Sequence, residues 1–149
     1  DYPNLLRIDS QLLSIWVTAF AIKDITISRK EDLKGYRVAY YRGRKNVEKY
    51  LSDVMPAKNI QTVNNDRQAF RLLSTHRTDI VISESIEGNN IIKSSEKFKN
   101  IREVFHLDET KIYAYMHIKH KHIASKIALI LEEMKNDGTF KQLIRSSSK

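Results

Sequence analysis

The chain has 149 residues, of which 41% are hydrophobic and 30% charged, and it contains no cysteine. This length fits one globular domain, or one lobe with an appendage, and no apolar run in the sequence is long enough to span a bilayer. The lack of cysteine excludes disulfides, thiol nucleophiles and cysteine-ligated metal centres. The formal net charge of +8 favours an acidic partner such as an anionic solute, a nucleic acid or an anionic lipid.

The first half of the chain predicts alternating strands and helices. Residues 37–41 predict a short strand, and residues 46–55 predict a helix that Pro56 ends. Residues 60–63 predict the next strand. A second helix follows, which Asn64, Asn65 or Asp66 can cap. Its apolar side consists of residues at helical spacing: Ala69, Phe70, Leu72 and Leu73.

The second half continues the alternation. Residues 79–83 predict a strand buried on both faces, because its centre is continuously apolar, and residues 85–95 are weakly helical. Residues 101–105 and 111–118 predict a fourth and a fifth strand. Two helices follow: the first covers residues 123–134 and stops at Gly138, and the second covers residues 139–144.

This order of elements predicts an α/β fold with a mostly parallel sheet flanked by helices, connected by right-handed crossovers. Ligands of such sheets bind at the carboxyl ends of the strands. Two segments are expected there: residues 42–45, after the first strand, and residues 83–85, after the third.

Basic residues concentrate near the first of these segments. More than half of the excess positive charge falls between residues 29 and 49. Arg42 to Asn46 opens a helix, whose free amides and positive dipole end favour an anion. Arg44 and Lys45 would add charge to such an anion seat. The alternative interpretation is a solvated basic turn.

Three segments, in order and at matching spacing, resemble bacterial family 3 extracellular solute-binding proteins. They are EDLKGYRVA at 31–39 followed by Gly43, AFRLL at 69–73 followed by RTDIVISE at 77–84, and MKNDGTF at 134–140. Members of this family are type II periplasmic binding proteins. The resemblance covers most of the chain from about residue 28 onward.

The resemblance implies two α/β lobes that close around a solute and are joined by crossover strands. Residues 1–27 would hold the outgoing crossover and a remnant of the first lobe, most of which is expected to be missing. Residues 28–110 would form the second lobe. Residues 111–149 would provide the return crossover and the C-terminal helices.

The anion seat gives five candidate ligand-binding residues, Arg42, Gly43, Arg44, Lys45 and Asn46, and the resemblance adds a sixth, Glu84. Glu84 stands where the family has an aspartate that meets a solute amino group; the alternative is a helix-capping acid. Arg44 and Lys45 replace small hydroxyl residues of the family, and His76 replaces a common glycine.

The sequence gives little support for a metal site or a catalytic site. His117, His120 and His122 follow a strand into a turn, and solvated histidines are favoured there over a metal site. No phosphate-binding loop, nucleophile motif or nucleophile–base pair can be read from the spacing. No enzyme activity, metal or cofactor is therefore expected.

The sequence predicts binding of a small solute, amino-acid-like or anionic, for ABC-type import or transmembrane signalling outside the cytoplasm. Its partner would be an ABC permease or a sensor kinase. The alternative is a basic nucleic-acid-binding domain, which lacks a recognisable motif here. If a lobe is missing, the chain is expected to form homo-oligomers through apolar side chains that lose their cover: Trp16, Phe20, Ile123 and Ile127.

Overall fold

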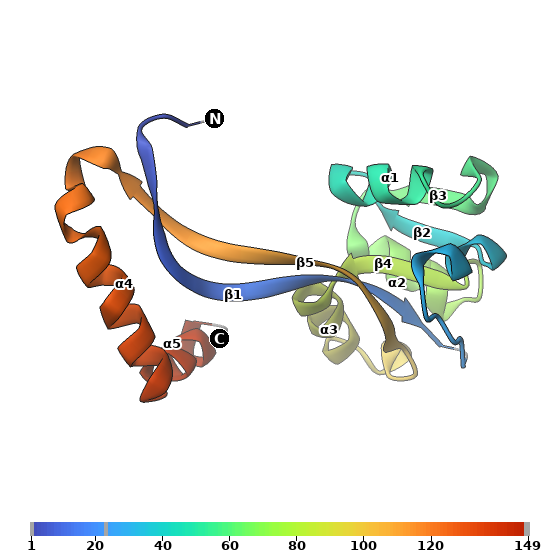
Figure 1. The fold of residues 1–149 in the computed structure, drawn as a ribbon. Coiled ribbons are helices and arrows are strands. Elements are labelled where there is room, and N and C mark those ends of the chain that lie inside the picture. The colour runs from blue at the N-terminus through green and yellow to red at the C-terminus, as the bar shows by residue number, and fades with distance from the viewer. Residues whose placement is uncertain (1, 23, 148–149) are drawn as a thin grey trace. The chain divides into compact units, whose positions relative to one another are not determined.

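The computed structural model describes residues 2–22 and 24–147. The chain divides into two compact units (Figure 1). We call residues 15–110 the sheet unit, and residues 1–14 with 111–149 the terminal unit. The strands β1 (Leu5–Ala21) and β5 (Arg102–His117) each contribute to both units.

The sheet unit is built on a mixed sheet with the strand order β3-β2-β4-β1-β5. Its three short strands are β2 (Val38–Tyr41), β3 (Ile60–Val63) and β4 (Ile80–Glu84). β2 runs parallel to both β3 and β4, whereas β1 pairs with β4 in the antiparallel direction. The register of that antiparallel pair places Val17 opposite Glu84.

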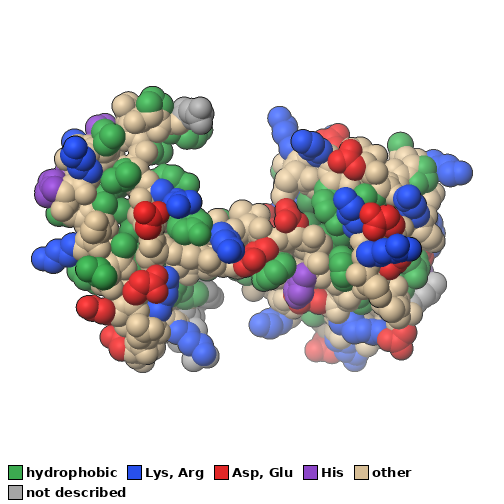
Figure 2. Space-filling view, viewed as in Figure 1, with side chains coloured by type: hydrophobic (Ala, Val, Ile, Leu, Met, Phe, Trp, Pro, Cys, Tyr) green, Lys and Arg blue, Asp and Glu red, His purple; other side chains and the backbone are tan. Residues whose placement is uncertain are grey.

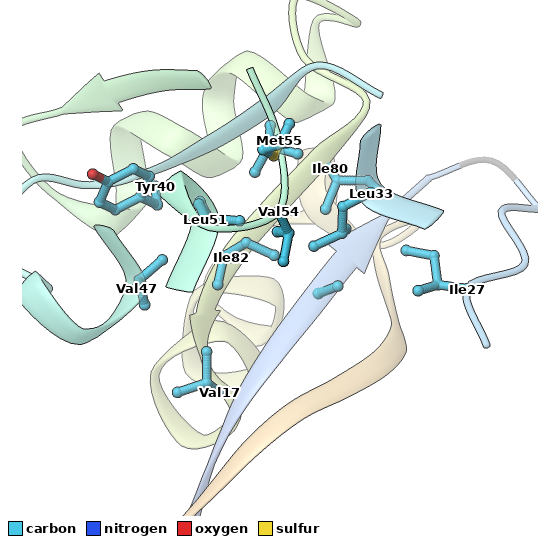
Figure 3. Packing of buried hydrophobic residues seen from close by; sticks show 12 residues of the cluster. Val17, Ile27, Leu33, Tyr40, Val47, Leu51, Val54, Met55, Ile80 and Ile82 are labelled. Atoms are coloured by element: carbon cyan, nitrogen blue, oxygen red, sulfur yellow. The ribbon is translucent and has the colours of Figure 1, made fainter. Parts of the chain in front are cut away.

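Helices cover both faces of this sheet because successive side chains of a strand point to opposite faces. Ile80 and Ile82 of β4 pack with α1 (Lys45–Ser52) in one apolar cluster (Figure 3). Val81, between them, packs with α2 (Asp66–Ser74) and α3 (Ser85–Lys93) in a second cluster. Three 3-10 helices complete the unit: Lys30–Gly35, Ala57–Asn59 and Glu96–Phe98.

The terminal unit contains the beginning of β1, the end of β5 and the C-terminal helices. A 3-10 helix (Ile118–His120) leads into α4 (Lys121–Asn136), and α5 (Thr139–Ser147) follows. Gly138 separates the two helices in the left-handed conformation, with a φ of 85°, as predicted from the sequence. No described residue of α4 is fully buried.

A polar group attaches α4 to β1. The hydroxyl of the buried Ser10 donates a hydrogen bond of 2.7 Å to Glu132, and Lys135 donates to Ser10 at 2.8 Å and to Glu132 at 2.6 Å. At the other end of the unit, the amide of Ile118 donates to the carbonyl of Asn4 at 2.9 Å.

Several sequence predictions of local structure were wrong. One continuous strand, β5, replaces the two strands predicted over 101–105 and 111–118. The first helix ends at Ser52 rather than at residue 55, because a turn precedes Pro56. Phe20 has not lost its cover, since its ring is fully buried against Phe70.

Among residues 2–22 and 24–147, no helix is long and apolar enough to cross a membrane.

Candidate ligand site at the carboxyl edge of the sheet

Three loops of the sheet unit meet where β2, β3 and β4 end. The parallel strands β3, β2 and β4 are neighbours, so their carboxyl ends lie along one edge of the sheet. The loop after β2 carries Arg42, Gly43 and Arg44. The loop after β3 carries Asn64 and Asn65, and Glu84 is the last residue of β4.

Arg44 connects these three loops. Its guanidinium donates to Asp66 through Nη2 at 2.9 Å and through Nε at 3.4 Å. Its Nη1 donates to the carboxylate of Glu84. The side chains of Arg44 and Asp66 are 13% and 9% exposed, so this pair is shielded from water. Burial by itself would lower the pKa of Arg44, but the hydrogen bonds and charges of Asp66 and Glu84 outweigh it and raise that pKa.

Asp66 is fixed from its own helix and from β4. It is the first residue of α2, where Asn65 caps the helix by accepting the Gln68 amide at 2.9 Å. The hydroxyl of Ser83, buried in β4, donates to Asp66 Oδ1 at 2.8 Å. Asp66 therefore has three hydrogen-bond donors directed at its carboxylate, which lets the charge remain buried.

Glu84 is the open part of this group. Its side chain is 40% exposed, far more than that of Arg44 or Asp66. The group formed by Arg44, Asp66 and Glu84 contains two carboxylates and one guanidinium. It therefore has an excess of negative charge when all three are ionised, and the accessible part of that charge is on Glu84.

The other predicted residues of this region make no side-chain hydrogen bond or ion pair to the group within the described chain. Arg42 donates to the side chain of Asn64. A Cβ at Gly43 would overlap the ring of Tyr41, so a larger residue there would require that ring to shift. Lys45 is exposed at the start of α1, and no ion pair joins it to another part of the described chain.

Asn46 lies in the first turn of α1. It lines a small hollow of about 20 Å³ with Val17, Val47, Tyr50 and Asp108. Val17 is the residue that pairs with Glu84 in the sheet. Burial, together with the charges of Glu31 and Asp108, raises the pKa of Tyr50 and keeps its hydroxyl protonated. This hollow would have to widen to admit anything larger than a water molecule.

Arg44, Ser83 and Glu84 fall in the two strand-end segments predicted from the sequence, whereas Asp66 was not predicted as part of the site. Asp66 was considered only as a helix cap, although the cap is Asn65. A signal was available: the loop after the 60–63 strand is also a strand-end loop of a parallel sheet. Only the strand order, with β2 between β3 and β4, brings that loop beside Arg44.

His117 and His106 make contacts with nearby groups of the protein. His117 Nδ1 accepts the amide of Lys119 at 3.1 Å, at the start of a 3-10 helix. His106 Nδ1 lies 3.0 Å from the hydroxyl of Thr18, and its ring centroid lies 5.1 Å from that of Trp16. Within the described part of the chain, no three histidine or acidic side chains are grouped so that they could hold a metal ion.

Comparison with known proteins places this geometry in context. No family model matches the chain. A protein of Shewanella oneidensis that is described as uncharacterized is 28% identical over 144 residues, which are 93% of this chain and 54% of that protein. The chain thus spans about half the length of this relative.

The similarity to solved structures covers nearly the whole chain. A probable amino-acid ABC transporter extracellular-binding protein of Bacillus subtilis matches 94% of this chain and 62% of its own, with a TM-score of 0.70 and 22% identity. The chain has a periplasmic-binding-protein-like fold. A histidine kinase sensor domain with similarity to periplasmic binding proteins also matches 94% of this chain and 62% of its own, with a TM-score of 0.64 and 20% identity.

A mutant of ArgBP from T. maritima gives a TM-score of 0.61 at 20% identity and is covered over 61% of its length. The predicted α/β class, with a mostly parallel sheet, and the predicted similarity to type II periplasmic binding proteins are confirmed at the level of the fold.

Proposed function

We propose that this protein binds a small solute, amino-acid-like or anionic, without chemical conversion. The site is the edge of the sheet unit formed by the loops after β2, β3 and β4. The observation that carries the proposal is the half-exposed carboxylate of Glu84 at the end of β4, held by the buried Arg44–Asp66 pair. A rigidly positioned, partly desolvated carboxylate at the end of a parallel strand suits recognition of a solute's amino group.

The structural neighbours support this proposal through their own described roles. They include a binding protein of an amino-acid ABC transporter and a histidine kinase sensor domain. We propose that this protein also binds its solute outside the cytoplasm, which its similarity to the extracellular-binding protein of Bacillus subtilis supports. We also propose that residues 28–110 act as one lobe of a two-lobe binding protein, with residues 1–27 and 111–149 as crossovers and C-terminal helices.

A thermal-shift panel tests the proposal. It contains amino acids, dicarboxylates, phosphate, polyamines and short DNA, each at low and high salt. A bound solute raises the melting temperature by mass action. We expect one class of small solute to give a shift that persists at high salt. That shift should vanish in Glu84→Gln but persist in Glu87→Gln, a control at an exposed carboxylate of α3.

The same panel separates the alternative function. The net charge of +8 favours nucleic acid as well as anionic solutes. A shift with DNA alone that disappears at high salt would contradict solute binding and identify a basic nucleic-acid-binding domain.

The homo-oligomer stays a prediction. Phe20 no longer belongs to its contact surface, because that side chain is buried. Trp16 and Ile123 are 36% and 38% exposed, and Ile127 is half-buried. Analytical ultracentrifugation tests it, and a monodisperse monomer would contradict it.

A further inference from the structure

The carboxylate of Glu84 is already occupied by a cation of the protein itself. Arg44 has two hydrogen bonds to Asp66, where both side chains are nearly buried, and one to Glu84, which is 40% exposed. The guanidinium of Arg44 therefore already balances the charge of the accessible carboxylate of Glu84.

Arg44 is held more strongly by Asp66 than by Glu84. Its paired contacts with Asp66 are shielded from water and are reinforced on the acceptor side by the hydroxyl of Ser83. The single contact with Glu84 competes with water, and such partly exposed ion pairs are weak. A competing cation can therefore displace Arg44 from Glu84 while Arg44 stays bound to Asp66.

We propose that the solute presents an ammonium or guanidinium group that exchanges with Arg44 at Glu84, so that Arg44 is a resident competitor that lowers the affinity. This inference rests on the proposed function, since it names the chemistry of the same site. The excess negative charge of Arg44, Asp66 and Glu84 favours a cation over a carboxylate at this position. It selects the amino-acid-like branch of the proposed function over the purely anionic one.

The arrangement also predicts how substitution of Arg44 changes the affinity for a cationic ligand. A ligand that needs a free Glu84 has an apparent affinity reduced by the fraction of time that Glu84 is free. Weakening the Arg44–Glu84 contact should therefore strengthen binding, which is the reverse of the usual effect of altering a site residue. If Glu84 is free for about a tenth of the time, the gain approaches roughly tenfold.

Isothermal titration calorimetry on the whole chain tests this. The two probes are agmatine, which has a guanidinium and an ammonium but no carboxylate, and succinate, which has carboxylates and no cation. Arg44→Lys keeps a charge beside Asp66 but loses the planar fork that holds two carboxylates. Because that variant could still bridge both acids, the double variant Arg44→Gln/Asp66→Asn replaces the buried pair with neutral hydrogen-bonding amides.

We expect agmatine to bind the wild type and to bind at least one of these two folded variants roughly three- to tenfold more tightly. Arg67→Lys, a control at an exposed residue of α2 whose guanidinium donates to Ser94, should bind as the wild type does. Glu84→Gln should lose agmatine binding.

The outcomes distinguish the two levels of the proposal. Unchanged or weaker agmatine binding in both Arg44 variants, with loss in Glu84→Gln, would overturn the exchange and leave solute binding intact. Binding of succinate but not agmatine would also overturn the exchange and support the anionic branch. Binding of neither probe, together with no shift in the thermal panel, would overturn the proposed function itself.

Discussion

The two units of this chain differ in how they are held together. In the described residues, every buried hydrophobic side chain except Ile8 belongs to the sheet unit, where two apolar clusters cover both faces of the sheet. The terminal unit contributes a buried serine, Ser10, and an amphipathic helix with no buried residue. Figure 2 shows hydrophobic side chains at the surface of the part that carries α4 and α5.

Burial of apolar surface is the main source of folding free energy, so the sheet unit has far more of that stabilisation per residue. The terminal unit has polar links and an open hollow of about 480 Å³ between β1 and α4. Its exposed apolar side chains include Leu129, Ile130, Leu143 and Ile144. A precise binding site needs a rigid support, and the two buried apolar clusters of the sheet unit suit that role.

The largest expected effect is in the core of the sheet unit. Phe70 is fully buried, with its ring centroid 5.2 Å from that of Phe20 and 6.3 Å from that of Phe98. Phe70→Ala should lower the free energy of unfolding by about 3–5 kcal/mol through lost burial and a cavity. Leu129→Ala, at a side chain of the terminal unit that is 66% exposed, should change it by less than about 0.5 kcal/mol.

Urea unfolding measures both variants, and the single tryptophan, Trp16, provides a fluorescence signal from within the sheet unit. Similar losses for Phe70→Ala and Leu129→Ala would show that α4 is covered in solution, and the contrast between the units would fail.

The second effect concerns the charged group of the sheet unit. Arg44→Ala leaves Asp66 buried without its paired cation, which should lower the free energy of unfolding by about 2–4 kcal/mol. Arg42→Ala, in the same loop, removes only an exposed contact with Asn64 and should cost less than about 1 kcal/mol. Thermal and urea unfolding measure both.

Equal effects of Arg44→Ala and Arg42→Ala would mean that Asp66 becomes hydrated or protonated without penalty. The site would then not be a rigid part of the sheet unit.

The fold could be predicted where local pattern and tertiary packing agree. The strand Ile60–Val63 has the predicted bounds, and the helix with Ala69 and Phe70 buries the predicted side. The pattern failed along β5, where residues 108–111 are all exposed and break the alternation of a half-buried strand. The pattern gave no strand at all over β1, which begins at Leu5 and includes polar residues such as Asp9 and Gln11.

Only those residues of the site that follow directly from chain order could be predicted. Arg44 and Glu84 follow strands and could be identified from chain order. The participation of Asp66 depends on β2 lying between β3 and β4, and that order is fixed by packing between distant segments rather than by local sequence.

The third prediction concerns the terminal unit. Ser10→Ala removes the hydroxyl between Glu132 and Lys135, and should lower the stability of the α4 attachment by about 1 kcal/mol at pH 7. Hydrogen bonds from Lys135 and Ser10 lower the pKa of Glu132. A lowered folded-state pKa means that this contribution is present above the ordinary glutamate range and is lost as the pH falls through the folded value.

The cost of Ser10→Ala should therefore shrink below about pH 4. Urea unfolding followed by circular dichroism at pH 7 and at pH 3 measures this cost, with Ser125→Ala, at an exposed residue of α4, as the control. A cost that stays the same at both pH values would show that Ser10 acts through packing rather than through the carboxylate of Glu132.

The smallest effect returns to the sheet unit and should be a gain. His76 has a φ of 56°, in the left-handed region that costs an L-residue roughly 1–2 kcal/mol. Its carbonyl accepts a hydrogen bond from Arg37 at 3.0 Å, which glycine retains. His76→Gly relieves the strain but adds freedom to the unfolded chain worth about 0.5–1 kcal/mol, so a net gain of about 0.5–1 kcal/mol is expected. The control Arg77→Gly has no such strain to relieve, so its free energy of unfolding should fall in the same urea experiment. If the free energy of unfolding of His76→Gly also falls, the imidazole makes a contact that stabilises the protein by more than the backbone strain costs.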